Sequence, residues 1–287
     1  MAATIAFDQW TAVRNSLHEA TRRFAELVAA APGPGVSEVK ATKHWSIAKT
    51  AAHVVTISRL YTAVVRDGAV PLPYTDIEDQ LKSTTVDSVR DFNEVMLRQF
   101  PERDPVKLAE HLRRDVDDML EVTREADPAR PSDWLGGARV PLAGLFAHLL
   151  NEVLIHGRDI ALPIGADWTI PSKDAGMFLE LFVMGMTRES LGGILDSTTP
   201  IPERRIAVEF RSEYTAPAVM VLQHRRAFIE EPGGEIDVRL SFDPAVLNLM
   251  LFGRISKARA ILSRKVMIGG RRPWLLPVFM RTVRFPS

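Results

Sequence analysis

Glu152, His156 and Asp159 are ionisable side chains in the largely apolar sequence PLAGLFAHLLNEVLIHGRDIAL at residues 141–162. Glu152 and His156 are four residues apart, and Asp159 follows His156 by three. On an α-helix, these spacings place side chains on one face. A carboxylate in apolar surroundings is costly unless it is paired, hydrogen-bonded or bound to a metal. The sequence therefore indicates either a metal site or a group of polar side chains that satisfy one another.

A second segment contains another histidine in apolar surroundings. His53 lies in WSIAKTAAHVV, whose small and apolar residues are typical of a buried helix. Two histidines and one carboxylate leave coordination positions open, which suits catalytic zinc or another divalent ion. Asp159 could accept the second N–H of His156, and His148 is a further candidate on the face of Glu152. Because a lone buried histidine is more often structural, the residues alone leave both interpretations open.

The composition excludes several kinds of protein. The 287 residues contain 36 Lys plus Arg and 36 Asp plus Glu, so there is no basic excess for a nucleic-acid partner. There is no cysteine, so any thiol used in chemistry must come from outside the chain. We find no signal-peptide pattern and no apolar run near the roughly 18 residues that span a bilayer. We therefore expect a cytoplasmic protein with no membrane partner.

The first part of the chain has the periodicity of helices and no strand signal. Ser46 is a predicted N-cap, and Pro105 is acceptable in a first helical turn. The Pro- and Gly-rich residues 32–35 end the first helix. The predicted helices cover residues 6–30, 46–66, 85–100, 105–126 and 140–162. This pattern favours a helical bundle over residues 1–165.

The second part of the chain mixes helices with alternating segments. Alternation predicts strands at 205–210 and 235–242, and a strand or strand pair at 217–231. Further helices are expected at 172–195 and from Pro244, with Asp243 as its cap. The segment SKARAILS at 256–263 follows, before a short strand at 265–270. Residues 166–287 are thus predicted to be an α+β domain with an antiparallel sheet, and the whole chain to combine α with α+β.

The helix WSIAKTAAHV resembles one in the mycothiol-dependent maleylpyruvate isomerase family, a branch of the DinB-like up-down four-helix bundles. Trp45 and His53 have the spacing found in that family, and HLLNEVLIHGRDIA is similar to a later helix of it. The resemblance covers about residues 5–165. It implies that His53, Glu152 and His156 bind a divalent metal, usually zinc, within a domain of residues 1–165.

Residues 166–287 are similar to the sterol-carrier-like domain that often follows in such proteins. The similarity lies in FDPAVLNLMLFGR, KARAIL and KVMIGG. We expect this domain to close one side of the metal cleft. The alternative is that it carries an apolar ligand in a tunnel of its own.

The resemblance also implies a reaction. A metal stabilises the thiolate of an exogenous thiol, here mycothiol, for attack on a small electrophile. The enzyme would then be an isomerase or a transferase, and it could be a monomer or a homodimer. Two other functions remain open: a metal-dependent hydrolase with the same ligands, and a non-catalytic carrier that uses residues 166–287.

The sequence differs from the family pattern at two places. Family members often carry an acidic residue four positions after the tryptophan, where this chain has Lys49. Many have an arginine shortly before the metal-binding glutamate, where this chain has His148 and Asn151. We expect these differences to affect substrate or thiol contacts, for which Trp45, His148 and Arg225 are the candidates. A solvated strand edge is the alternative for Arg225.

Overall fold

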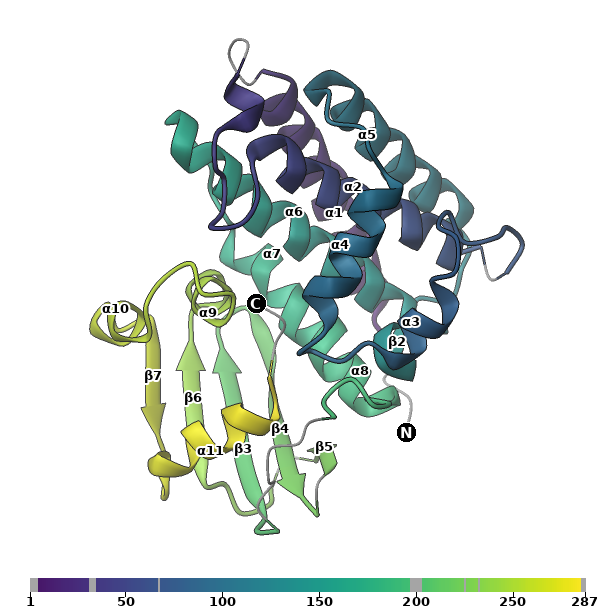
Figure 1. The fold of residues 1–287 in the computed structure, drawn as a ribbon. Coiled ribbons are helices and arrows are strands. Elements are labelled where there is room, and N and C mark those ends of the chain that lie inside the picture. Colours follow the sequence, from purple (N-terminus) through teal and green to yellow (C-terminus); the bar gives the residue numbers. More distant parts are fainter. Residues whose placement is uncertain are drawn as a thin grey trace.

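The structure is a computed structural model, in which a group of helices lies beside a sheet (Figure 1). It describes residues 5–30, 35–66, 68–196, 203–224, 226–231 and 233–284. Arg225 and most of the predicted breaker at 32–35 lie outside the described residues.

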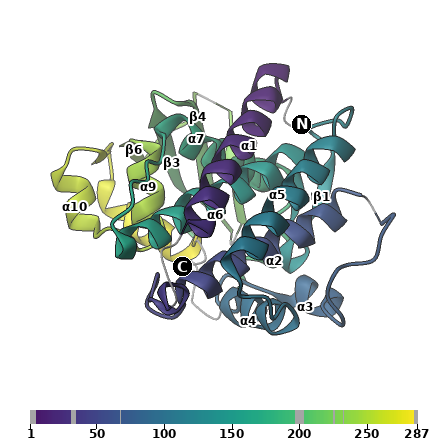
Figure 2. The same cartoon turned by 90° about the horizontal axis from the view of Figure 1, so that it is seen from above.

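Four long helices form the predicted bundle. They are α1 (Phe7–Ala29), α2 (Ile47–Val64), α5 (Pro105–Val122) and α6 (Leu142–Ile164). Helices α1 and α2 each pack against both α5 and α6, and the four run close together in Figure 2. Ser46 accepts a hydrogen bond from the Lys49 N–H, so the predicted N-cap of α2 is confirmed.

Shorter elements lie between these helices. They are α3 (Glu78–Ser83), α4 (Val89–Gln99) and the antiparallel strands β1 (Pro131–Asp133) and β2 (Arg139–Pro141). The sequence shows no strand signal here, so the two short strands within the predicted bundle are an addition to it. Two strands of three residues are too short to show an alternating pattern, and α3 is too short to show helical periodicity.

The predicted helix at 172–195 contains a change of helix type and ends early. It consists of α7 (Ser172–Met177), a π-helix (Phe178–Val183) and α8 (Met184–Glu189). The helix ends because Ser190 is extended, with φ −167° and ψ 129°, and forms a bridge with Arg139. The π-helix packs against α6, so this part of the chain lies against the bundle.

The sheet contains five strands in the order β5-β4-β3-β6-β7. They are β3 (Ile206–Ser212), β4 (Thr215–Gln223), β5 (Arg226–Glu230), β6 (Val238–Phe242) and β7 (Val266–Gly269). The predicted antiparallel pairing is confirmed for three neighbouring pairs, but β3 and β6 are parallel. The chain crosses from β5 to the far side of β3 before β6, and an alternating pattern does not specify the strand direction that results.

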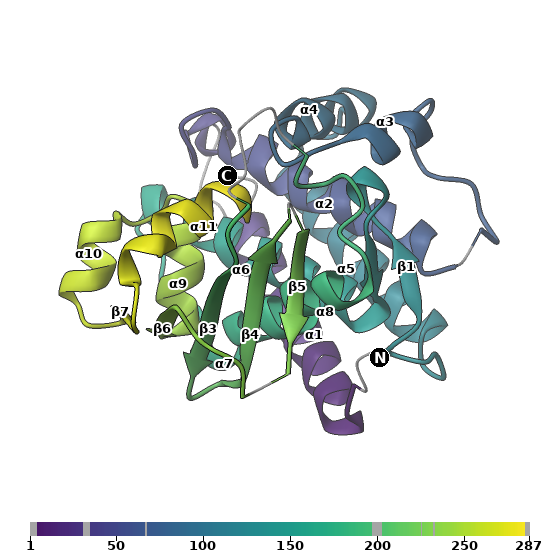
Figure 3. The same cartoon turned by 90° about the horizontal axis from the view of Figure 1, so that it is seen from below.

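Three helices accompany the sheet: α9 (Pro244–Leu251), α10 (Lys257–Leu262) and α11 (Leu276–Thr282). Asp243 caps α9 as predicted, because its Oδ1 accepts the Val246 N–H at 3.1 Å. Helix α11 lies over one face of the sheet in Figure 3. The ring centroids of Phe279 in α11 and Phe210 in β3 are 6.4 Å apart. These helices complete the mixed α/β part of the chain.

The helical part and the sheet share one hydrophobic core. The same cluster of buried side chains contains Phe146 of α6, Phe178 of the π-helix and Phe242 of β6. The predicted boundary at residue 165 falls at Gly165, which ends α6 with φ 67°. The division into domains of residues 1–165 and 166–287 stays a prediction. In the described part of the chain, no helix is both long enough and apolar enough to cross a membrane.

Candidate metal centre

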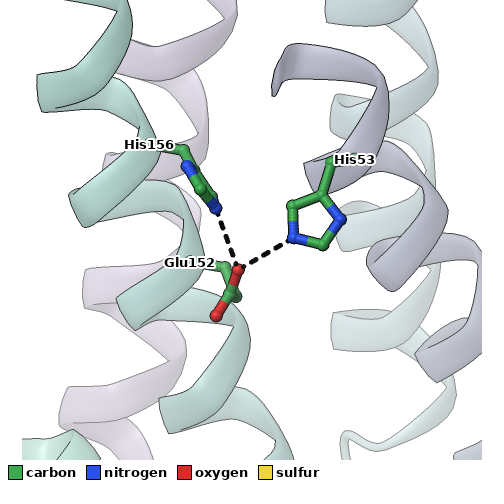
Figure 4. A group of neighbouring side chains, drawn as sticks. All are labelled: His53, Glu152 and His156. Carbon is green, nitrogen blue, oxygen red and sulfur yellow. Dashed lines mark ion pairs between the residues drawn. The ribbon is translucent and has the colours of Figure 1, made fainter. Parts of the chain in front are cut away.

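The three predicted ligands meet between α2 and α6 (Figure 4). Glu152 Oε2 lies 3.3 Å from Nε2 of His53 and 3.3 Å from Nε2 of His156. One donor atom from each of these residues lies within 4.8 Å of the other two. Both histidines are buried. The folded chain thus brings together two imidazoles and one carboxylate, a donor set that could hold a divalent ion.

Asp159 lies at the outer side of His156, as its spacing on α6 predicted. Its Oδ2 is 3.0 Å from His156 Nδ1. A carboxylate is an acceptor, so the histidine donates from Nδ1 and directs Nε2 towards Glu152. Asp159 also accepts from Arg254, whose Nη2 lies 2.6 Å from Oδ2. Sequence reasoning missed Arg254, which follows α9 and carries no local signal of this contact.

Burial and hydrogen bonding shift the pKa values of Glu152 and His156 in opposite directions. Burial alone would raise the pKa of Glu152, but hydrogen bonds from His156 and His53 hold that pKa well below its usual range. Burial would lower the pKa of His156, but hydrogen bonds to Asp159 and Glu152 raise it to about 9. Burial lowers the pKa of His53. Without a metal, the cluster therefore holds a glutamate anion, a protonated His156 and a neutral His53.

Trp45 covers His53, with its ring centroid 4.7 Å from that of the histidine. Its Nε1 donates to Glu94 Oε1 at 2.8 Å, and Lys49 Nζ lies 2.9 Å from Glu94 Oε2. Glu94 belongs to α4 and was not predicted to contribute. A carboxylate from another helix therefore stands beside Trp45, although the chain has Lys49 where an acidic residue is frequent in the family it resembles.

His148 stands one helical turn before Glu152. Its Nε2 is 3.8 Å from Glu152 Oε1, which is beyond hydrogen-bonding distance. Its Nδ1 lies 3.1 Å from the Tyr61 hydroxyl, which in turn accepts from Trp134 Nε1 at 2.7 Å. Burial lowers the pKa of His148. Neither Tyr61 nor Trp134 was predicted to belong to the site.

The cluster opens into a cavity of about 1130 Å³. The side chains that line it include Trp45, Trp134, Asn151 and Arg254. The cavity is therefore walled both by the bundle and by the segment that follows α9. Within the part of the chain that the structure describes, His224 and Arg226 are exposed and lie outside the lining of this cavity.

The chain matches the model of a known protein family over the residues that form the site. A family model described as the mycothiol maleylpyruvate isomerase N-terminal domain matches residues 17–161, a range that contains all three candidate ligands. No curated protein matches the chain.

Two solved structures are also similar to the chain. One is the crystal structure of the mycothiol-dependent maleylpyruvate isomerase, at 16% identity and a TM-score of 0.49. The other is a histidine-to-alanine mutant of that isomerase, at 15% identity and a TM-score of 0.48. Each comparison covers 91% of this chain and 92% of the other.

Proposed function

Because the chain belongs to the mycothiol maleylpyruvate isomerase family, whose members are enzymes, we propose that it is a mycothiol-using isomerase or transferase. In this proposal His53, Glu152 and His156 hold a divalent ion, with zinc as the first choice. The substrate is a small electrophile. The observation that carries the proposal is the position of Glu152 Oε2, 3.3 Å from both Nε2 atoms at the wall of a large cavity.

The spacing of the donor atoms suits zinc. Tetrahedral zinc has bonds of about 2.0–2.2 Å to nitrogen and oxygen, which puts its ligand atoms about 3.3 Å apart. The two measured separations from Glu152 Oε2 are both 3.3 Å. Two histidines and one carboxylate are also a donor set found in catalytic zinc sites. Asp159 adds the outer hydrogen bond that usually orients a histidine ligand.

A bound divalent ion would supply the positive charge that favours a thiolate over a thiol. The chain supplies the surroundings. Asp159 holds the His156 ring so that Nε2 faces Glu152, and Trp45 covers the His53 ring. The chain has no cysteine, so the thiol must be an external one. A cavity of about 1130 Å³ has room for a thiol cofactor together with a small substrate.

The two other functions have less support. A hydrolase could use the same three ligands, so only dependence on a thiol separates it from the proposed enzyme. A lipid carrier would need a large apolar cavity among residues 166–287. A second cavity, which Phe178 and Met220 line together with Trp134 and His148, holds only about 30 Å³ and is too small for a lipid.

The direct test measures turnover and thiol binding on the same preparation. Zinc-loaded protein is incubated with maleylpyruvate and with mycothiol, glutathione or no thiol. The proposal predicts isomerisation that requires mycothiol and disappears in His53→Ala. Cobalt-substituted protein should show a change in visible absorption when mycothiol, but not its S-methyl derivative, is added. Hydrolytic turnover without any thiol would instead identify a hydrolase.

A further inference from the structure

A chain of hydrogen bonds with a defined direction holds the ring of His148. The indole N–H of Trp134 can only donate, and it lies 2.7 Å from the Tyr61 oxygen. Tyr61 is 3% exposed, so its own hydroxyl proton needs an acceptor inside the protein. His148 Nδ1, at 3.1 Å, is that acceptor among the described residues. In this arrangement Nδ1 accepts and carries no proton, so a neutral ring has its proton on Nε2.

Aromatic rings fix the position of His148. Phe178 and Phe182 stack on each other with centroids 5.3 Å apart, and Phe182 lies 4.6 Å from the histidine ring. Both belong to the π-helix, which packs against α6. Phe182 also meets Trp134 edge to face at 4.9 Å. These contacts pack the histidine ring among aromatic side chains. Short π-helical segments between α-helical turns are frequent at functional sites.

The second ring nitrogen of His148, Nε2, lies towards Glu152, which also lines the cavity. His148 lines the cavity, and its Nε2 has no hydrogen-bond partner among the residues that the structure describes. Glu152 Oε1, at 3.8 Å, is too far away to accept a hydrogen bond. The ring therefore presents an unused N–H donor beside the three candidate metal ligands.

A second unused donor lies three residues further along the same face of α6. Asn151 also lines the cavity and is 2% exposed. Its Oδ1 accepts from Asn248 Nδ2 at 3.0 Å, which defines its Nδ2 as the remaining donor. That nitrogen is buried and has no partner in the described part of the chain. Because buried polar groups are nearly always hydrogen-bonded, we expect this donor to bind a ligand or a water molecule.

We propose that His148 Nε2–H, together with Asn151 Nδ2–H, forms a subsite for a carboxylate or carbonyl oxygen of the substrate. This inference rests on the proposed function, because the substrate is the electrophile that reacts beside the metal. It deepens that function by requiring an oxygen acceptor in the substrate. His148 serves here as a donor that binds and orients, because its Nδ1 already accepts from Tyr61.

The first experiment locates the proton and needs no metal. Metal-free protein labelled with ¹⁵N-histidine is studied by NMR, and the His148 signals are assigned by their loss in His148→Gln. The inference predicts an unprotonated Nδ1 and a protonated Nε2 in the wild type. Tyr61→Phe should give a mixture of the two tautomers. A proton on Nδ1 in the wild type would overturn the inference, whatever the outcome for the metal.

The second experiment measures binding of pyruvate, which contains both kinds of oxygen, to zinc-loaded protein. His148→Leu should keep its zinc but bind pyruvate about ten- to a hundredfold more weakly, the scale for a hydrogen bond to a charged acceptor. His148→Gln keeps an N–H near the position of Nε2 and should stay within about threefold of the wild type.

Two results would contradict the subsite. One is unchanged pyruvate affinity in His148→Leu, and the other is no pyruvate binding to zinc-loaded wild type. Failure of the wild type to bind zinc would instead count against the proposed function. In that case the NMR result still decides whether His148 is the donor.

Discussion

Arg254, in the loop after α9, binds Asp159 of α6 through two nitrogens of its guanidinium. The two residues are 95 positions apart in the sequence. Arg254 Nη2 lies 2.6 Å from Oδ2, and its Nε lies 3.1 Å from Oδ1. Asp159 in turn accepts from His156 Nδ1. The C-terminal part of the chain therefore fixes the carboxylate that orients a candidate metal ligand. Because both side chains are largely buried, this ion pair is little screened by solvent.

Replacing Arg254 should weaken metal binding although Arg254 is not a candidate ligand. In Arg254→Ala, Asp159 loses its cation and His156 is less firmly oriented. We expect zinc affinity to fall about ten- to a hundredfold, the effect typical of lost outer hydrogen-bond partners. Competition with a chromophoric chelator measures it. Arg271→Ala, which removes an exposed arginine paired with Glu235, is the matched control. Equal affinities in the two variants would show that Arg254 does not support the site.

Metal binding should release a proton. His156 is protonated in the metal-free cluster, because its pKa is raised to about 9 from an ordinary 6.5. A metal ion needs the Nε2 lone pair, so binding at pH 7 should release about one proton. Calorimetry in two buffers of different ionisation enthalpy measures this number. Asp159→Asn removes the hydrogen bond that raises the His156 pKa, and should reduce the release. No release in the wild type would contradict the protonated cluster.

The same shift predicts how stability of the metal-free protein changes with pH. The folded-state pKa of His156 lies above the unfolded value, so the stabilisation is fully present below about pH 6.5. It is lost as the pH rises through about 9. Urea unfolding of metal-free protein at pH 6.5 and 9.5 should show a lower free energy of unfolding at the higher pH. His156→Gln should remove most of this difference, and an unchanged difference in that variant would assign it to other groups.

Asp115 of α5 should destabilise the protein near neutral pH. Burial raises its pKa to about 6 from 3.8, despite a hydrogen bond from Ser58. The destabilising effect of the buried Asp115 carboxylate is therefore absent below about pH 4, where the group is protonated in both states. It is complete once the pH has risen through about 6. Asp115→Asn should raise the free energy of unfolding at pH 8 by about 1–3 kcal/mol and change it little at pH 4. Asp117→Asn, on the same helix but exposed, is the control. A gain of equal size at both pH values would argue against a buried charge.

Gly144 marks a close approach between α6 and the π-helix. A Cβ atom there would lie 2.7 Å from the backbone oxygen of Leu181 and 2.5 Å from Val140 Cγ1. The backbone oxygen cannot move aside cheaply, so Gly144→Ala should lower the free energy of unfolding by about 1–3 kcal/mol. Gly269→Ala, where a Cβ would meet nothing within 4 Å, should be nearly neutral. Chemical denaturation checks both variants. Equal stability of the two would mean that the helices can separate without cost.

Local signals made the helix starts predictable. Ser46 and Asp243 each accept an N–H three residues away, so the residues that make the contact lie within one short segment. The pairing of Glu152 with His156 is local in the same sense. His53 could be suggested as their partner from its apolar surroundings alone, but no spacing links α2 to α6, and only the resemblance to a family implied that it is a ligand.

Contacts between distant segments were not predictable from the sequence. Glu94 reaches Trp45 across 49 residues, and neither segment carries a pattern that indicates the other. The tautomer of His148 depends on Tyr61 and Trp134, which come from separate elements. The parallel direction of β6 beside β3 also depends on a crossover and not on alternation. The hydrogen-bond partners and the strand direction all depend on how distant segments pack in the folded chain.

The central claim is that His53, Glu152 and His156 hold one divalent ion. Elemental mass spectrometry on purified wild type, His53→Ala and Glu152→Ala, each after incubation with zinc and removal of free metal, tests it most directly. The account predicts about one ion per wild-type chain and almost none in either variant. Circular dichroism of the variants should confirm that they remain folded. No ion in the wild type, or the same content in all three proteins, would contradict the claim and leave the three residues as a buried polar cluster.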